Sequence, residues 1–358
     1  MKDKIIKVLV VDDSAYNRMK ITDMLESSPT VKVVGVALDG EDAIKKAINL
    51  KPDIITLDLE MPRMDGFTFL RIMASNFPTP TIVVSSRNDS QNVFKALELG
   101  AVDFIEKPTH QASSELLKIR DELLYKVGMA AQVSINRIKT LPVPAVATPP
   151  AKLVVPAVPE TEFSLVAIGA STGGPSALQT VLSMLPPDIP SAVVISQHMP
   201  PGFTKTFAGR LNKFSPFEVK EAENGDIVRP GRVLISPGGF NMTFIKNGAS
   251  VAARLLPGED MDRYVPSINR MFVSASELFG SRAVAVVMTG MGNDGKEGVV
   301  KIKSAGGKII AQSEDTSVIF GMPREAIATG VVDLVLPLQG IAEGIVQCAK
   351  RTKPKPSP

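Results

Sequence analysis

The stretch LVAIGASTGGPSAL, residues 165–178, decides the fold of the longer part of the chain. Its first six residues form an unbroken apolar run of strand length, and the segment from Ser176 onward has the pattern of a helix. Between them Ser171 lies in the pattern Gly-x-Ser-x-Gly, whose glycines leave room for a sharp strand-to-helix turn. The serine would therefore stand beside the free N–H groups of a helix start, which favour a negative oxygen.

Further strand-like runs follow this stretch, with helical segments between them. They are AVVISQ at 192–197, RVLISP at 232–237, AVAVVMTG at 283–290 and KIIAQ at 308–312. This alternation predicts an α/β domain, in which helices cover both faces of a parallel sheet. The ligand crevice of such a doubly wound sheet lies at the carboxyl ends of its strands.

The N-terminal part of the chain has the same alternation. Its strand-like runs are KVLVVDD at 7–13, VKVVGVA at 31–37, DIITLDL at 53–59, TIVVSS at 81–86 and AVDFIEK at 101–107. Prolines, alanines and valines dominate the region between the two patterns, which is typical of an extended linker. We therefore expect a first domain at 3–125, a linker at 126–161, a second domain at 162–350 and a disordered tail at 351–358.

Composition excludes several classes of protein. The 358 residues include 40 basic and 37 acidic side chains, a balance that does not favour nucleic-acid binding. Cys348 is the only cysteine, so an internal disulfide is impossible and a reducing compartment fits best. The N-terminus lacks the pattern of a signal peptide, and no apolar run reaches membrane-spanning length. We expect a cytoplasmic protein without direct membrane insertion.

A catalytic triad is predicted in the second domain. A serine hydroxyl needs a base, and of the two histidines only His198 lies in this domain, at the end of a predicted strand. Asp294 lies in the loop TGMGNDG after another strand, so one sheet edge would bring Ser171, His198 and Asp294 together. The order Ser, His, Asp differs from that of the usual α/β-hydrolases. A nucleotide-binding loop is disfavoured, because the glycine spacing is wrong and no lysine follows.

Acidic residues end two strands of the first domain. Asp12 and Asp13 follow the first strand and Asp58 the third, so three carboxylates should meet at one edge. Such a cluster suits Mg²⁺, which prefers hard oxygen ligands and phosphoryl groups. Ser85 and Lys107 end the fourth and fifth strands, where a hydroxyl and an ammonium could hold a phosphoryl group on Asp58.

The motifs DDS, DLEMPRMDG, SS and KP, in this order, resemble the response-regulator receiver family over residues 3–125. The resemblance implies a flavodoxin-like fold. It implies the following roles: phosphoacceptor, Asp58; Mg²⁺ ligands, Asp12, Asp13, Asp58 and the Glu60 carbonyl; residues that move on activation, Ser85 and Phe104; phosphate partner, Lys107.

The motifs IGASTGGPSAL, QHMPPGFT, PGGF, TGMGNDG and GMPREAI resemble the chemotaxis-specific protein-glutamate methylesterase family, CheB. This resemblance implies a Rossmann-like catalytic domain that hydrolyses glutamate methyl esters on methyl-accepting chemoreceptors, releasing methanol. Many members also deamidate receptor glutamines. It further implies a chemotaxis histidine kinase as phosphoryl donor, no cofactor for the esterase, and a receiver that covers the triad until it is phosphorylated.

Carried onto this sequence, the resemblance makes Ser171 the nucleophile, His198 the general base and then acid, and Asp294 the residue that orients the imidazole. Thr172 and the backbone N–H of Met291 are weaker candidates for assisting the nucleophile or binding the oxyanion.

This sequence departs from its relatives at two positions near the site. Asn241 replaces a frequent histidine and Asn269 a common aspartate, changes that could alter substrate preference or loop packing. Which of Arg263 and Arg270, if either, meets an acidic substrate stays open. The alternative function is a phosphorylation-controlled binding protein with an inactive hydrolase fold, which would not need an intact triad.

Overall fold

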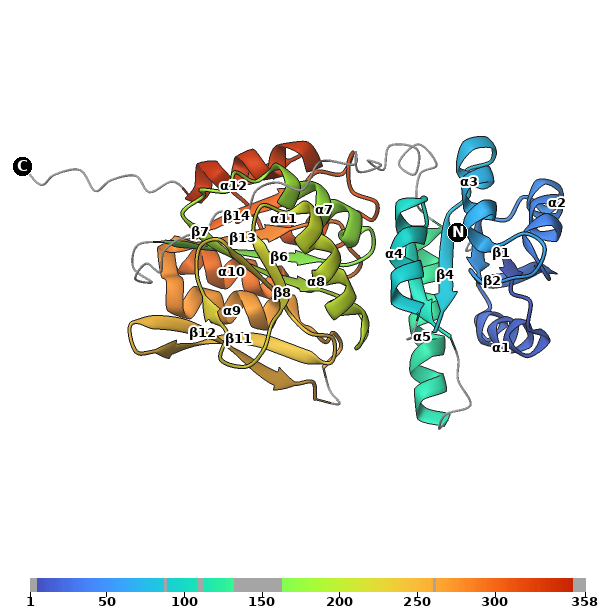
Figure 1. Ribbon diagram of the computed structural model, residues 1–358, viewed down its shortest axis with the longest axis horizontal. Coiled ribbons are helices and arrows are strands. Elements are labelled where there is room, and N and C mark those ends of the chain that lie inside the picture. Colours follow the sequence, from blue (N-terminus) through green and yellow to red (C-terminus); the bar gives the residue numbers. More distant parts are fainter. Residues whose placement is uncertain (1–4, 87–88, 108–112, 132–162, 260–261, 350–358) are drawn as a thin grey trace, which may run out of the picture. The chain divides into compact units, whose positions relative to one another are not determined.

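Two compact units make up the chain, Met1–Val143 and Pro144–Pro358, in the computed structural model (Figure 1). The structure describes residues 5–86, 89–107, 113–131, 163–259 and 262–349. No helix in this described part is long and apolar enough to cross a membrane.

The first unit is a five-stranded parallel sheet with the strand order β2-β1-β3-β4-β5. Its strands are β1 Ile6–Val11, β2 Val31–Ala37, β3 Ile54–Leu57, β4 Thr81–Ser85 and β5 Asp103–Glu106. Its helices are α1 Ala15–Glu26, α2 Gly40–Leu50, α3 Gly66–Asn76, α4 Ser90–Glu98 and α5 Ser113–Ala130. Helix α1 contacts α5, and α2 contacts α3. The predicted flavodoxin-like fold is confirmed.

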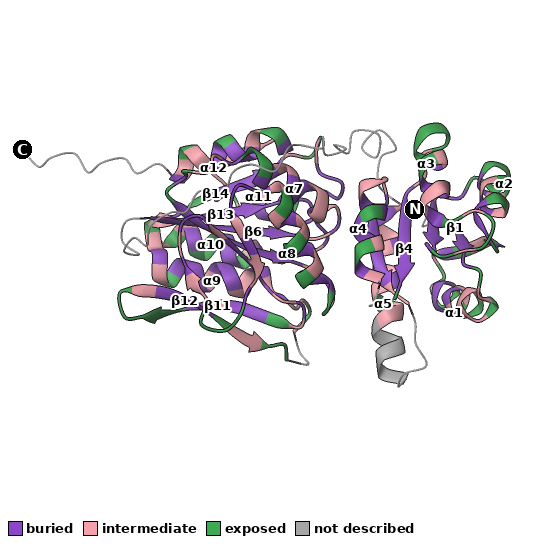
Figure 2. Ribbon diagram, viewed as in Figure 1, coloured by how far each residue is buried: buried purple, intermediate pink, exposed green. Residues whose placement is uncertain are grey.

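Burial explains why the central strands read as unbroken apolar runs. Strands β3 and β4 are buried along their whole length, because helices cover both faces of the sheet (Figure 2). Three helices of this unit, α1, α2 and α3, begin after a residue whose side chain caps them. Ser14, Asp39 and Asp65 each accept a backbone N–H from the first turn of the following helix.

Helix α5 extends five residues past the predicted end of the first domain at 125. Lys126 on this helix donates to Asp103 Oδ1 at 3.2 Å and to the Phe104 carbonyl at 2.6 Å, and Val127 and Ala130 are buried. Residues 126–130 therefore belong structurally to the first unit and not to a linker. The remainder of the predicted linker lies outside the described residues, except for Ala131, and so does the tail at 351–358.

The second unit is built on a seven-stranded parallel sheet, with the order β15-β14-β13-β6-β7-β10-β8. Its strands are β6 Ser164–Ala170, β7 Ser191–Gln197, β8 Glu218–Glu221, β10 Arg232–Ile235, β13 Ala283–Val287, β14 Lys308–Gln312 and β15 Leu334–Leu336. Its longer helices are α7 Gly174–Met184, α8 Phe203–Phe214, α9 Ile268–Phe279, α10 Lys296–Ser304, α11 Met322–Ile327 and α12 Ile341–Ala349. Helices α9 and α10 cover one face of the sheet, and α7 and α12 the other (Figure 1). The doubly wound parallel sheet is confirmed.

A small antiparallel sheet was not predicted. It has the order β11-β12-β9, with β9 Ile227–Val228, β11 Phe240–Asn247 and β12 Ser250–Pro257. Strands β11 and β12 form a hairpin whose turn contains Gly248 at φ +61°. The hairpin packs on α9, where the Phe244 N–H donates to Ser274 Oγ at 2.8 Å. It thereby supports the helix that follows it in the chain.

The order of the main sheet positions the site. Strand β6, the first strand of the unit, lies between β13 and β7. The strands that follow β6 in the chain are therefore added on both sides of it. The carboxyl ends of these three neighbours meet at one edge, where doubly wound sheets bind ligands.

Candidate active site

Ser171 stands on a tight turn after β6. Its N–H donates to the Thr289 carbonyl at 3.0 Å, and its carbonyl accepts the Gly174 N–H at 2.8 Å. Gly173 has a φ of +76°, which a larger residue would adopt only with strain. A Cβ on Gly174 would lie 2.0 Å from Oε1 of Gln197. Gly173 is therefore required by the backbone conformation of the turn, and Gly174 by the lack of space beside Gln197.

His198 and Asp294 form a bonded pair beside this turn. His198 follows β7, and its N–H donates to the Ala170 carbonyl at 3.0 Å. Its Nε2 lies 2.9 Å from Oδ2 of Asp294. The imidazole is 14% exposed and the carboxylate 2%. The loop that carries Asp294 also passes Ser171, because a Cβ on Gly290 would lie 2.8 Å from the serine Cβ.

Asp294 also lies at the start of helix α9. Its carboxylate accepts the N–H groups of Ile268 at 2.7 Å and Asn269 at 2.9 Å, and the Ser267 hydroxyl at 3.3 Å. Burial would raise the pKa of Asp294, but the hydrogen bond and charge of His198 and these N–H groups outweigh it and lower the pKa. The carboxylate is therefore ionised, and His198 Nε2 donates to it. The basic nitrogen of the imidazole is then Nδ1.

Thr172 and Met291 both lie buried beside the serine turn. The Thr172 carbonyl accepts the Thr289 hydroxyl at 2.9 Å. Met291 follows Gly290, whose carbonyl accepts the N–H groups of Gly321 at 3.1 Å and Met322 at 2.9 Å. These bonds fix the loops around Ser171. A role for either residue in oxyanion binding stays a prediction.

Three residues at this site were missed from the sequence. Gln197 donates from Nε2 to the carbonyls of Ser171 at 2.9 Å and His198 at 3.0 Å. The Tyr264 ring stacks on the His198 imidazole. Ser267 is the N-cap of α9. Gln197 is adjacent to the histidine in QHMPPGFT and could have been noticed there, whereas nothing in the sequence links Tyr264 to His198.

The two asparagines singled out near the site, Asn241 and Asn269, have structural partners. Asn241 is fully buried, donates from Nδ2 to Asp262 Oδ2 at 3.0 Å and accepts the Ser267 N–H at 2.7 Å. Asn269 Oδ1 accepts the N–H of Gly298 on α10 at 2.9 Å. Both amides therefore hold the loops and helices around Asp294 in place.

The two arginines have different surroundings. Arg270 lies 2.7 Å from Asp262 Oδ1 and 3.8 Å from Glu259 Oε1. Arg263 is exposed, lies with Cζ 5.3 Å from the centroid of the Tyr264 ring, and forms no ion pair with the described residues. Arg263 is thus the arginine whose charge is available to a ligand.

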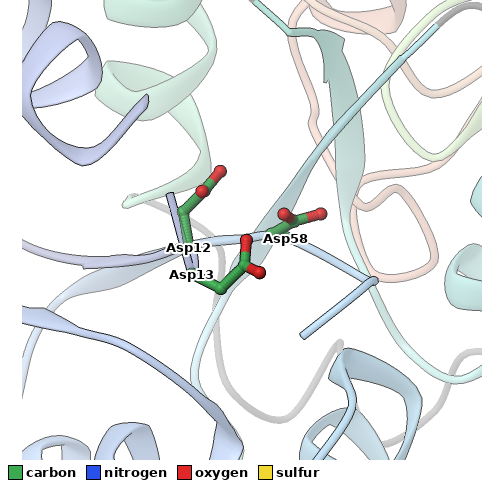
Figure 3. Close-up of side chains that lie close together, drawn as sticks. All are labelled: Asp12, Asp13 and Asp58. Atoms are coloured by element: carbon green, nitrogen blue, oxygen red, sulfur yellow. The ribbon is translucent and has the colours of Figure 1, made fainter. Parts of the chain in front are cut away.

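In the first unit, Asp12, Asp13 and Asp58 converge at the edge of the sheet (Figure 3). One carboxylate oxygen of each lies within 4.8 Å of the others. Burial and the charge of Asp58 raise the pKa of Asp12 to about 6, and burial also raises the pKa of Asp58 despite Lys107. Lys107 Nζ is 2.6 Å from Asp58 Oδ2 and 3.9 Å from Asp12 Oδ2. Crowded carboxylates whose ionisation is disfavoured fit a hard dication such as Mg²⁺.

The other receiver residues predicted from the sequence are Ser85, Phe104 and Glu60. Ser85 ends β4, is buried and donates to Asp89 Oδ2 at 3.1 Å, while Phe104 on β5 is buried. Glu60 is exposed, and its N–H donates to Asp58 Oδ1 at 3.3 Å. The roles of Ser85 and Phe104 in switching, and of the Glu60 carbonyl as a metal ligand, stay predictions.

Comparison with family models divides the chain in the same way as the fold. The model described as CheB methylesterase matches residues 166–345, and the model described as response regulator receiver domain matches residues 8–119.

Relatives match the chain along almost its whole length. A protein of Geobacter sulfurreducens named protein-glutamate methylesterase/protein-glutamine glutaminase 3 is 53% identical over 96% of this chain and 97% of its own. A Halalkalibacterium halodurans protein with the same activities in its name is 46% identical over 97% and 99%. The crystal structure of the Thermotoga maritima CheB methylesterase catalytic domain covers 52% of this chain and 98% of its own, at 40% identity and a TM-score of 0.51.

Proposed function

The chain belongs to the CheB methylesterase family and carries a response regulator receiver domain, and from this membership we propose a specific mechanism for its site. The enzyme is a protein-glutamate methylesterase/protein-glutamine glutaminase under the control of its receiver. Its substrates are the γ-methyl esters of chemoreceptor glutamates, from which it releases methanol, and glutamine side-chain amides, from which it releases ammonia. The alternative of an inactive binding protein loses its support.

Acylation uses the pair that the structure holds beside Ser171. The serine Oγ attacks the ester carbonyl carbon while its proton passes to His198 Nδ1, because Nε2 is already bonded to Asp294. The ionised Asp294 stabilises the imidazolium that forms. As the tetrahedral intermediate collapses, the C–O bond to the methoxy group breaks and the imidazolium gives its proton to the departing methanol.

Deacylation repeats these steps with water. His198 removes a proton from water, the hydroxide adds to the acyl carbon, and the serine oxygen leaves with the proton held by the imidazolium. The free glutamate side chain remains on the substrate. We assign the oxyanion to the backbone N–H of Met291 and to Thr172, just before helix α7, each such donor contributing about 3 kcal/mol.

The receiver supplies the control. Asp58 accepts the phosphoryl group, and Lys107 pairs with it from its position 2.6 Å from Asp58 Oδ2. Mg²⁺ held by Asp12, Asp13, Asp58 and the Glu60 carbonyl would offset the charge of the phosphoryl oxygens. Ser85 and Phe104 then change position, and the catalytic domain is released from inhibition. A shift of about 1–3 kcal/mol in this equilibrium changes activity about 5- to 150-fold.

The partners in this proposal are methyl-accepting chemoreceptors as substrate and a chemotaxis histidine kinase as phosphoryl donor. Nucleic acid and direct membrane insertion have no place in it, and the esterase itself needs no cofactor. We place the enzyme in the cytoplasm, since a chain with one cysteine suits a reducing compartment. The domain limits are part of the proposal: a receiver from residue 3 that helix α5 extends from 125 to Ala130, a linker up to 161, a catalytic domain at 162–350 and a tail at 351–358.

One observation carries the catalytic proposal: the bonded pair of His198 and Asp294 lies next to a serine on a Gly-flanked turn, at the shared edge of β13, β6 and β7. The test is methanol release from membranes that contain methylated chemoreceptors. Wild type should release methanol, and Ser171→Ala should not. Ser176→Ala changes a half-buried serine on helix α7, which follows Ser171, and should match wild type. Equal release by the Ser171→Ala variant and wild type would remove Ser171 from its role.

A further inference from the structure

The ring of Tyr264 lies face to face with the catalytic imidazole. The two ring centroids are 4.6 Å apart, and the ring planes differ by 5°. Tyr264 comes from the segment between β12 and α9, whereas His198 follows β7. A stack with nearly parallel planes restricts the rotation of both rings.

Hydrogen bonds hold the segment that carries this tyrosine at both of its ends. Asp262 accepts the Asn241 amide at 3.0 Å, the Glu259 N–H at 3.0 Å and Arg270 at 2.7 Å. The N–H of Glu259 lowers the pKa of Asp262, and Arg270 and Asn241 add to this effect. Together they outweigh burial, which would raise the pKa, so this carboxylate stays charged. At the other end Ser267 donates its N–H to Asn241 Oδ1 at 2.7 Å. The buried Asn241 therefore joins the two ends of the segment 262–267, and the position of Tyr264 is built into the fold.

The ring of Tyr264, and not its hydroxyl, makes the contact with the site. The phenolic oxygen is buried and has no hydrogen-bond partner among the described residues. An unpaired buried hydroxyl costs stability, so the hydroxyl does not explain why a tyrosine occupies this position. The stacking of its ring on His198 explains it better.

We propose that Tyr264 is a positioning residue for His198, an inference that rests on the base role proposed above. The bond from Nε2 to Asp294 fixes one point of the imidazole but leaves it free to swing about that point. The stacked ring fixes its plane, so that Nδ1 stays directed at Ser171. The same ring face attracts the imidazolium that forms during the reaction. The guanidinium of Arg263, which lies against the same ring, limits this attraction.

The test compares Tyr264→Leu with Tyr264→Phe in the full chain. Leucine keeps an apolar side chain, though a smaller one, and has no aromatic face, while phenylalanine keeps the face and loses only the unpaired hydroxyl. For methanol release from methylated receptors, we expect Tyr264→Phe to match wild type. Tyr264→Leu should lose about 10- to 100-fold in kcat with KM nearly unchanged, because a displaced base slows the chemical steps and not binding. Equal kcat for Tyr264→Leu and wild type would overturn the inference.

A second measurement observes the imidazole of the folded protein directly. ¹⁵N NMR of the imidazoles requires the assignment of only two histidines, and His110→Gln identifies the signals of His198. In wild type, the neutral His198 should carry its proton on Nε2, and in Tyr264→Phe it should do the same. A wild-type enzyme with the proton on Nδ1 would overturn the inference. An inactive wild type would instead remove the proposed function, which the methanol assay with Ser171→Ala reports separately.

Discussion

Oδ2 of Asp294 lies 2.9 Å from Nε2 of His198 and 2.7 Å from the N–H of Ile268, the first residue of helix α9. The same carboxylate therefore orients the imidazole and caps a helix. The catalytic role proposed for Asp294 and the capping of α9 therefore depend on one side chain. The hairpin of β11 and β12 packs on this helix and consequently supports the candidate site, although it contains none of the residues proposed as catalytic.

We expect Asp294→Asn to reduce kcat about 10³- to 10⁴-fold, because the amide no longer selects the imidazole tautomer with Nδ1 free or stabilises the imidazolium. The measurement is steady-state methanol release. Ser267→Ala is the matched control, since it removes the side-chain cap of α9 but leaves the carboxylate on His198. It should lower the free energy of unfolding by about 1 kcal/mol with a far smaller effect on kcat. Similar kcat values for the two variants would contradict this division of roles.

Gln197→Leu should impair both stability and activity, because its amide donates to the carbonyls of Ser171 and His198 and ties the two turns together. Leaving these two acceptors without a donor should cost about 1–3 kcal/mol of unfolding free energy. Urea denaturation and methanol release measure the two effects. Gln179→Leu is the control, because Gln179 is also buried but its Nε2 has no partner among the described residues. An equal loss of unfolding free energy in both variants would show that the two hydrogen bonds of Gln197 do not contribute to stability.

Arg263→Ala should raise KM for methylated receptors and leave the melting temperature unchanged, because this exposed cation forms no ion pair with the described residues. Arg270→Ala should instead lower the melting temperature, since it leaves Asp262 without its charged partner. Kinetics at several ionic strengths and thermal denaturation distinguish the two. If Arg263→Ala leaves KM and its salt dependence as in wild type, Arg263 does not meet the substrate.

The carboxylate cluster of the receiver predicts a dependence of Mg²⁺ binding on pH. Burial and Asp58 raise the pKa of Asp12 to about 6, so the folded receiver disfavours the ionised carboxylate. Without a cation, stability should therefore increase as the pH falls through about 6 towards the ordinary value near 4. Mg²⁺ favours the ionised form. It should raise the melting temperature of the receiver more at about pH 7.5 than at about pH 5.5, and Asp12→Asn should lose most of this difference. An Mg²⁺ effect that does not vary with pH would contradict the prediction.

Much of the fold could be predicted because central parallel strands are buried on both faces. Runs such as LVAIGA are apolar at every position, and each was found as a strand. The hairpin was missed because β11 and β12 are partly exposed and contain Asn241, Thr243 and Arg254 among their apolar residues. The first domain was ended five residues before the end of α5 because the ion pair of Lys126 with Asp103 joins residues on different elements.

The same distinction holds for the site. Ser171, His198 and Asp294 were predicted because each follows a recognisable strand. Tyr264 and Asn241 make contacts that only the folded chain creates, the first with a histidine that follows β7 and the second between two ends of one segment. No periodicity or spacing marks such residues.

The most direct test of phosphorylation-controlled serine catalysis is methanol release from methylated chemoreceptor membranes with and without a small-molecule phosphoryl donor and Mg²⁺. Wild type, Asp58→Asn and Ser171→Ala are compared. We expect the donor to accelerate methanol release by wild type about 5- to 150-fold and to leave Asp58→Asn at the unstimulated rate. Ser171→Ala should release no methanol under either condition. Acceleration of Asp58→Asn to the wild-type level, or methanol release by Ser171→Ala, would contradict the account.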